Sequence, residues 1–332
     1  LKVSSYYVQA TANGRRAISG IYTVTADRPA PVFPTFTPVD YTIQLEDYLY
    51  NPTQEFNFPC VVDTKDHPVS NGWGDYRYYL FYAPHDAPAG NCVAASNSLN
   101  GPWVEYDGNP VIGKTWAMED GSGNYYSVSH VSSPHVMWNE QHGCWFMYFH
   151  GENPTTRYAT SDDLIHWTYG GVCVTANQFS PTGSGFSEAS YARVYEHEVP
   201  GLGNRYIMLL MITGSGNNMH RNIYWAYSDD AISWTPVTTS LLNPDMDPQY
   251  MNNFSGPWFM EWDGRYFVIC HASSGEIYAF EVGEGLDEVI PWGILYESRG
   301  QRYDSDTDDD AEWPDYGRAG APCFIQDDDG VW

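Results

Sequence analysis

The sequence predicts an all-β protein, a five-bladed β-propeller with an extended N-terminal arm. Short apolar runs alternate with polar turns rich in Gly, Asn and Asp, a pattern typical of antiparallel strands joined by hairpins. The same plan recurs along the chain, and Trp103, Trp167 and Trp234 stand 64 and 67 residues apart near the ends of successive units. A repeat of this length, built from four short strands, is typical of a propeller blade.

The chain of 332 residues divides at about residue 50. Residues 1–50 form the predicted arm, with a strand at 21–25 and a proline-rich, extended stretch at 29–38. Residues 51–332 form the predicted propeller. Its last blade is either incomplete or closed by the arm, because the final unit stops where a second strand should begin.

Five units follow one another in the propeller, and each begins with a strand expected to line the central channel. The first spans residues 55–112, with strands at 56–62, 78–82 and 92–95. The second has apolar runs at 136–138 and 144–149 and ends at Trp167. The third spans 188–242, with strands at 191–195, 206–211 and 223–227. The fourth begins at 254–257 and has a strand at 266–270, and the fifth begins at 317–319 and turns at 327–330.

Charge and composition limit the partners. The formal net charge of −27 disfavours nucleic acid, because binding to phosphates needs a basic surface. No run of 18 apolar residues occurs, so no membrane partner is predicted. The chain begins at Leu1 rather than Met, and with the acidic surface this predicts a processed protein that is secreted or periplasmic. The oligomeric state stays open.

Two features bear on cofactors. The six cysteines contain no C-x-x-C pair, which disfavours a zinc site; they fit buried thiols or disulfides whose pairing the spacing does not give. The acidic run at 304–310 has the D-x-D-x-D spacing of a calcium loop, but Asp309 stands where glycine is needed. A solvated loop is preferred, no cofactor is required, and structural calcium is the alternative.

Polar residues gather where the first strand of each unit begins and its second strand ends. These strand ends are expected to meet at one mouth of the channel, which makes them candidates for a catalytic or sugar-binding site. The candidates on first strands are Glu55, Asn57, His135, Glu188, Tyr191, Arg193, Ser255, Trp258 and Arg318. Those at the ends of second strands are His85, Asp86, His150, Glu152 and His271.

Structural interpretations stand beside these functional ones. A histidine at a strand end can also anchor a loop, and Glu188 can pair with Arg193 or Arg318. Tyr191 and Trp258 are either core aromatics or platforms for sugar rings. Small residues flank Glu188, and a carboxylate is costly to bury without a partner, which favours a function for it.

The second unit resembles the five-bladed propeller glycosidases, which include family 43 arabinanases and xylosidases, family 32 fructosidases, family 117 neoagarobiose hydrolases and family 130 phosphorylases. Ser133-Pro134-His135-Val136, the aromatic second strand, the run at 157–163 and Trp167 carry the resemblance, which extends over about 55–332. It implies an Asp in the first blade, an Asp in the second and a Glu acid in the third. These fall at Asn57, His135 and Glu188, so only Glu188 keeps the expected type.

The departure at two positions leaves three functions open. The preferred one is hydrolysis of a glycosidic bond in a plant, algal or microbial polysaccharide or oligosaccharide. Glu188 is then the general acid/base, with His135 and His85 as further catalytic candidates. A second carboxylate would come from elsewhere, and the remaining mouth residues would bind sugar. The candidates for the second carboxylate are Glu55, Asp86, Glu119 and Glu152.

The second function is that of a polysaccharide lyase, which cleaves next to a uronate by β-elimination. His135, His85 or Tyr191 would be its base, and Arg193, Arg318 and Asn57 would neutralise the uronate. The third is a sugar-binding propeller without catalysis, which would have a mouth filled by bulky side chains.

Overall fold

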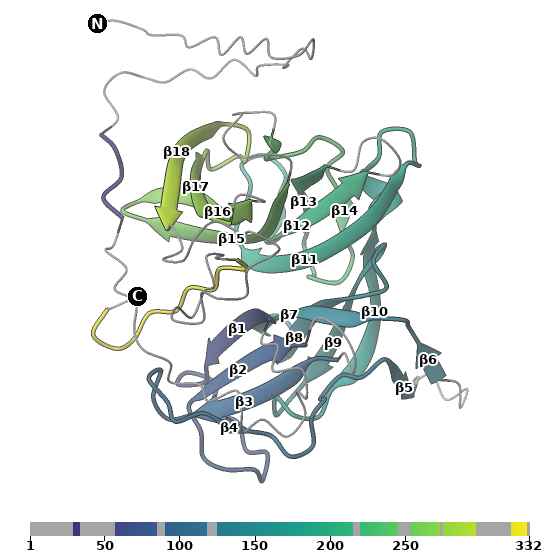
Figure 1. Ribbon diagram of the computed structural model, residues 1–332, viewed down its shortest axis with the longest axis vertical. Helices are drawn as coiled ribbons and strands as arrows, with labels where there is room; N and C mark the ends of the chain where they lie inside the picture. The colour runs from purple at the N-terminus through teal and green to yellow at the C-terminus, as the bar shows by residue number, and fades with distance from the viewer. Residues whose placement is uncertain are drawn as a thin grey trace, which may run out of the picture.

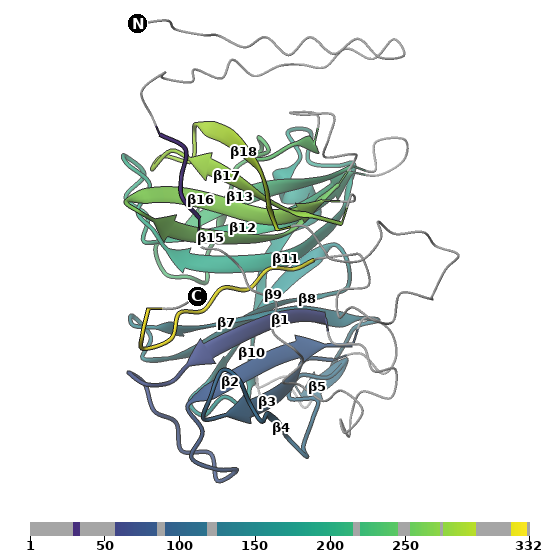
Figure 2. The ribbon, with the colours of Figure 1, turned by 60° about the vertical axis from the view of Figure 1, so that its left-hand side comes forward.

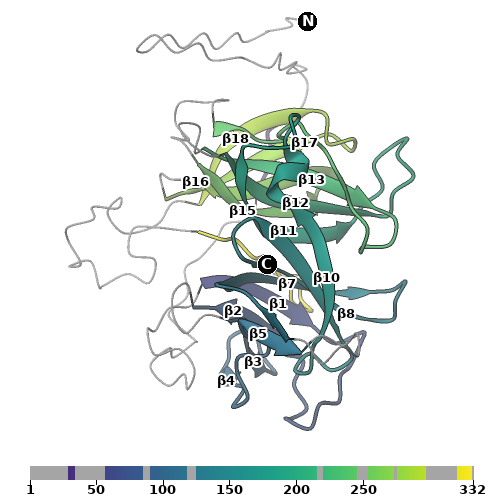
Figure 3. The same ribbon diagram turned by 90° about the vertical axis from the view of Figure 1, so that its right-hand side faces the viewer.

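The computed structural model describes residues 29–33, 57–84, 90–117, 125–214, 220–244, 253–272, 275–296 and 320–330. Within these ranges four four-stranded antiparallel sheets follow one another along the chain (Figures 1 and 3). The prediction of an all-β propeller is therefore confirmed. The described residues form four blades, whereas the sequence predicts five.

Each blade is a meander whose strands follow in chain order from one edge of the sheet to the other. The first blade contains β1 (Asn57–Asp63), β2 (Tyr78–Ala83), β3 (Cys92–Ser96) and β4 (Val104–Glu105). The second contains β7 (Val131–Asn139), β8 (Cys144–Gly151), β9 (Thr155–Ser161) and β10 (Thr168–Thr175). The third contains β11 (Phe186–Glu196), β12 (Tyr206–Gly214), β13 (Arg221–Ser228) and β14 (Thr235–Pro236). The fourth contains β15 (Phe254–Trp262), β16 (Arg265–Ala272), β17 (Ile277–Val282) and β18 (Val289–Tyr296).

Two smaller elements complete the described secondary structure. A hairpin of β5 (Thr115–Ala117) and β6 (Tyr125–Ser127) leads from the first blade to the second and projects from the sheets in Figure 1. A 3-10 helix at Ala176–Phe179 leads from the second blade to the third. No helix in the described parts of the chain is long and apolar enough to cross a membrane.

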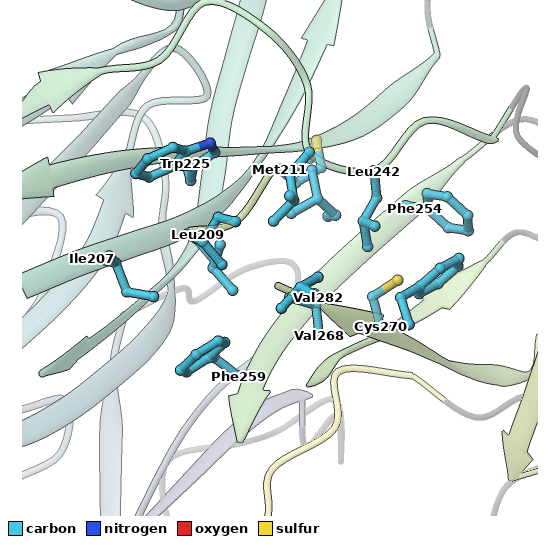
Figure 4. Packing of buried hydrophobic residues seen from close by; sticks show 14 of the residues in the cluster. Ile207, Leu209, Met211, Trp225, Leu242, Phe254, Phe259, Val268, Cys270 and Val282 are labelled. Atoms are coloured by element: carbon cyan, nitrogen blue, oxygen red, sulfur yellow. The ribbon is translucent and has the colours of Figure 1, made fainter. Parts of the chain in front are cut away.

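The second strands are buried along nearly their whole length, which explains why the sequence shows them as continuous apolar runs. All nine residues of β12 are buried, as are all six of β2. A strand covered on both faces needs apolar side chains on both. The faces are covered by neighbouring blades, since one apolar cluster lies between each consecutive pair. Figure 4 shows the cluster between blades three and four, where Leu209 and Met211 face Val268 and Phe254.

A repeated turn ends the third strand of blades two and three. Ser161 and Ser228 each bond to the carboxylate two residues later, through Ser161 Oγ to Asp163 at 3.2 Å and Ser228 Oγ to Asp230 at 3.0 Å. Each Asp in turn accepts backbone N–H groups two and three positions further along the chain. The repeated Ser-Asp-Asp motif is therefore a turn motif with the same role in both blades.

Every first strand contains a β-bulge at the same place. In β1 the two residues between Asn57 and Cys60 face a single residue of β2, and β7, β11 and β15 have the same register shift. One residue in each bulge has a left-handed φ, and Pro or Ala follows it. These residues are Phe58 (59°), Ser133 (58°), Tyr191 (57°) and Gly256 (57°), followed by Pro59, Pro134, Ala192 and Pro257.

Residues 320–330 lie between the fourth and first blades, as Figure 2 shows for the yellow segment beside β1 and β15. Ala321 in this segment has a φ of 48° and precedes Pro322, so the bulge pattern of the first strands continues here. The backbone N–H of Ala321 donates to His271 Nδ1 of β16 at 3.0 Å. At its other end, Asp328 pairs with Lys65 at 2.7 Å and with Arg77 at 2.5 Å.

The described part of the arm, residues 29–33, packs on the fourth blade. Trp262 Nε1 donates to the carbonyl of Val32 at 3.0 Å, and Arg265 donates to the carbonyl of Pro29 at 3.0 Å. The Phe33 ring meets the edge of Phe267 at a centroid distance of 5.0 Å. The strand predicted at 21–25 lies outside the described residues.

Candidate active site at the mouth of the propeller

The first strands of all four blades begin at one end of the propeller, where the second strands end. Ser132 of β7 pairs with His150 of β8, and Ser255 of β15 pairs with His271 of β16. The two histidines are therefore structurally equivalent. In the first blade Asn57 pairs with Ala83, so Ala83 takes the equivalent place there. This end of the propeller is called the mouth below.

Glu188 lies at the mouth near the start of β11, and its side chain is 16% exposed. Ser190 Oγ donates to Glu188 Oε1 at 2.9 Å, and Thr213 Oγ1 lies 3.5 Å from Oε2. Arg221 Nη2 lies 4.0 Å from the same Oε2. Two hydroxyls and one cation thus orient a carboxylate that remains in contact with solvent.

Arg221 is a mouth residue that the sequence analysis missed. Glu188 pairs with Thr213 across β11 and β12, and Thr213 pairs with Arg221 across β12 and β13, so the three form one row across the blade. Arg221 Nη1 also lies 3.5 Å from Ser255 Oγ of the fourth blade. The sequence analysis expected Glu188 to pair with Arg193 or Arg318. Among the described residues the arginine near Glu188 is Arg221.

Glu152 belongs to the loop between β8 and β9 at the same mouth. Its backbone has a left-handed φ of 69°, and its side chain is 41% exposed and lies 3.6 Å from the buried Arg157. The backbone N–H of Ala189, next to Glu188, donates to the carbonyl of Asn153 at 2.8 Å. That bond holds the loop that carries Glu152 beside the start of β11, the strand that carries Glu188.

Aromatic rings from three blades also gather near this end of the strands. Tyr191 meets Phe58 edge to face at a centroid distance of 5.1 Å and lies 6.0 Å from the buried ring of His150. His150 in turn lies 4.9 Å from the ring of His130. Asn57 is half-buried beside Phe58. The predicted group is thus spread over β1 with Asn57, β8 with His150, and β11 with Glu188 and Tyr191.

The expectation that His135 faces the open mouth is wrong, because its side chain lies within the channel. The residue is 3% exposed, and His135 Nε2 lies 2.9 Å from the carbonyl oxygen of Val194 in the third blade. His135 Nδ1 lies 3.8 Å from the sulfur of Cys60 in the first blade, and its ring lies 6.0 Å from Trp258 in the fourth. His135 therefore joins blades as an internal contact.

Arg193 and Trp258 also lie in the channel rather than at the mouth. Arg193 is 2% exposed and donates to the backbone carbonyls of Pro134 at 2.8 Å and Pro59 at 3.2 Å. Its guanidinium lies 5.6 Å from the Trp258 ring centroid. The arginine predicted to bind substrate instead ties the first strands of three blades together.

Of the remaining predicted residues, His271 makes a structural contact and the others lie outside the described residues. His271 Nδ1 accepts the Ala321 N–H, so this histidine anchors residues 320–330. Glu55, His85, Asp86, Glu119 and Arg318 lie outside the described residues.

The described residues contain no cluster of three or more His, Cys, Asp or Glu side chains arranged to hold a metal ion. The acidic run at 304–310 lies outside them. A pocket of about 250 Å³ lies at the opposite end of the third blade from Glu188 and is lined by residues such as Asn204 and Asp230. It is therefore separate from the mouth.

Neither a protein-family model nor a curated protein sequence matches the chain. Among solved structures it is similar to an exo-β-1,3-galactanase from Phanerochaete chrysosporium, with 14% identity, 65% of this chain and 47% of that chain covered, and a TM-score of 0.44. An α-L-arabinofuranosidase from Lactobacillus brevis gives 18% identity, 75% coverage of both chains and a TM-score of 0.49. An N-acetylgalactosamine deacetylase from F. plautii gives 16% identity, 74% and 72% coverage and a TM-score of 0.46.

The chain thus spans about half the length of the galactanase. A thermostable family 43 glycoside hydrolase is also among the similar structures, with 14% identity, 71% and 72% coverage and a TM-score of 0.48. These likenesses concern the fold alone, and the chemistry has to follow from the residues of the mouth.

Proposed function

We propose that the protein is a carbohydrate-active enzyme that hydrolyses a glycosidic bond in a plant, algal or microbial polysaccharide or oligosaccharide. The observation that carries the proposal is Glu188, a partly exposed carboxylate fixed at the mouth by Ser190, Thr213 and Arg221. A general acid must stand within hydrogen-bond reach of the glycosidic oxygen in a defined orientation. The two carboxylate oxygens together offer about four acceptor sites, so these contacts leave room for substrate.

Glu152 is the candidate for the second carboxylate. Hydrolysis needs a partner that attacks the sugar or activates water, and the separation of the two carboxyl groups sets the stereochemistry. Glu152 comes from the neighbouring blade, is more exposed than Glu188 and lies on a loop bonded to the residue after Glu188. Asn57 and Tyr191 at the same mouth are candidates for holding sugar hydroxyls and rings.

Lyase chemistry is the second candidate function, and the position of Arg193 makes it less favoured. A lyase needs a cation presented to the uronate, but the Arg193 guanidinium is buried and bound to two backbone carbonyls. Arg221 is the described mouth arginine left for that role, and it already faces Glu188. His135 is likewise enclosed and lacks access to a sugar C5 proton.

A screen against a polysaccharide panel with two readouts tests the proposal. Hydrolysis releases reducing ends without ultraviolet absorbance, whereas β-elimination leaves a conjugated double bond that absorbs. We expect reducing ends alone, and we expect Glu188→Gln to remove them. Absorbing products would establish the lyase. Binding to a sugar without any product, unchanged in the Gln variant, would establish the sugar-binding propeller.

A further inference from the structure

Cys60 and Cys323 occupy equivalent places, directly after the bulge proline of β1 and of residues 320–330. The backbone N–H of Val136 in the second blade donates to Cys60 Sγ of the first at 3.2 Å. In the same way, the N–H of Val61 in the first blade donates to Cys323 Sγ at 3.4 Å. Residues 320–330 therefore contact the first blade through the same kind of N–H to sulfur bond by which the first blade contacts the second.

The two thiols are also neighbours, because Val61, whose N–H donates to Cys323 Sγ, directly follows Cys60. The neighbouring Cys323 thiol, the His135 ring and the Arg193 guanidinium hold the pKa of Cys60 well below its usual value although burial raises it. The neighbouring Cys60 sulfur and burial both raise the pKa of Cys323. The thiolate form is thus favoured at Cys60, and the protonated thiol is favoured at the neighbouring Cys323.

The other described cysteines differ. Burial raises the pKa of the thiols of Cys92, Cys173 and Cys270, and none of the three has a second thiol among the influences on it. Cys60 itself is 1% exposed, so it has no access to a polysaccharide at the mouth. The placement of Cys323 Sγ against the residue after Cys60 therefore points to chemistry between the two sulfurs.

We propose that Cys60 and Cys323 form a disulfide that covalently closes the ring between the first blade and residues 320–330. The oxidant is a low-molecular-weight disulfide such as oxidised glutathione. Cys323, which is less buried than Cys60, loses its proton to solvent, attacks one sulfur of this oxidant, forms a mixed disulfide and releases one small thiolate. The Cys60 thiolate then attacks the Cys323 sulfur, which releases the second. Two protein thiols are oxidised, and one small disulfide is reduced to two thiols.

This disulfide would join positions separated by all four blades. A crosslink that encloses so long a stretch of chain strongly restricts the unfolded state, so it should raise the unfolding temperature by about 5–10 °C. Ring closure is separate from the chemistry at the mouth, and the proposal holds or fails independently of the hydrolase function.

The experiment oxidises the folded chain with oxidised glutathione, blocks free thiols with iodoacetamide in denaturant and maps the peptides without reductant. We expect a peptide pair linked through Cys60 and Cys323. We also expect an unfolding temperature that falls by about 5–10 °C when a reductant is added. Cys323→Ala should abolish both effects, whereas Cys270→Ala, a buried thiol on another strand, should keep both.

Separate alkyl or glutathione labels on Cys60 and Cys323 in the oxidised wild type would overturn the proposal, as would a linkage of either to another cysteine. A Cys60–Cys323 crosslink without a reductant-sensitive unfolding temperature would overturn the stabilising role. The peptide map uses the wild-type chain, so it stays decisive even when a variant fails to fold.

Discussion

The residues before and after the bulge of each first strand have different surroundings. Ser190 and Ser255 precede the bulge and contact Glu188 and Arg221 at the mouth. The residues that follow it fill the channel and contact one another across non-neighbouring blades, as His135 does with Trp258. Because a bulge adds one residue to its strand, it changes which side chains point inward. A distance of three residues along the chain therefore separates a mouth residue from a channel residue.

The two groups also differ in how their polar atoms are satisfied. In the channel, His135 and Arg193 contact backbone carbonyls of other blades, so their role is to join strands. At the mouth, Glu188 contacts side chains and keeps a solvent-accessible surface. We expect substitutions in the channel to change stability and substitutions at the mouth to change turnover.

The largest expected effect is on turnover, at Glu188. Glu188→Gln keeps the shape and the hydroxyl contacts but removes the titratable group, so we expect kcat to fall at least about a hundredfold. Glu196→Gln is the matched control, because Glu196 ends the same strand on an exposed surface and pairs with Arg205. Its kcat should stay within about twofold of wild type. Comparable losses in both variants would place the effect in the fold of β11 instead of in the chemistry.

The channel should respond in the opposite way. His135→Ala removes a buried ring that contacts three other blades, so we expect the free energy of unfolding to fall by about 2–3 kcal/mol. Turnover per folded molecule should stay within a few-fold of wild type. His166→Ala is the control, since that histidine is largely exposed and pairs with Asp163 three residues away; urea unfolding should show a loss below about 1 kcal/mol. If the folded His135→Ala variant instead shows a large fall in kcat, His135 takes part in catalysis.

The blade pattern is visible in the sequence because strands and turns leave local signals. Buried second strands appear as apolar runs, and the predicted bounds at 78–82, 206–211 and 266–270 fall inside β2, β12 and β16. The equivalence of His150 and His271 was also accessible, because both end such runs. Glu188 was placed at the mouth by the same logic, although its role is still a proposal.

The bulge is what sequence reasoning missed. Phe58, Ser133 and Tyr191 have left-handed φ values that such residues rarely adopt, so strict alternation gave no sign of the extra residue. A signal was nevertheless present. Phe-Pro-Cys, Ser-Pro-His, Gly-Pro-Trp and Ala-Pro-Cys begin at residues 58, 133, 256 and 321, and Tyr-Ala-Arg at 191 departs from them only by Ala. Aligning these triplets would have placed His135 and Arg193 in the channel.

A smaller effect is expected at Arg221, which orients Glu188 without replacing it. Arg221→Gln should lower kcat about tenfold, with little change in KM, because the carboxylate loses one of three contacts. Arg221→Lys should recover part of kcat, since a cation near Oε2 is restored. An unchanged kcat with a raised KM would make Arg221 a substrate-binding residue instead.

The smallest expected effect is on stability, at Asp328 in residues 320–330. Arg77 and Lys65 hold the pKa of the Asp328 carboxyl below its usual range. A carboxyl with a lowered pKa in the folded state contributes stability above its unfolded pKa, and this contribution is lost as the pH falls through the folded value. Asp328→Asn should therefore lower the unfolding temperature by roughly 2 °C at pH 7, and the difference from wild type should shrink toward pH 3.

Asp329→Asn is the matched control for this last comparison, because the described residues show no ion pair at the Asp329 carboxylate. Its unfolding temperature should follow wild type at both pH values. If Asp328→Asn also follows wild type, the ion pairs of Asp328 contribute nothing measurable. The attachment of residues 320–330 would then rest on the contacts that Ala321 and Cys323 make beside the channel.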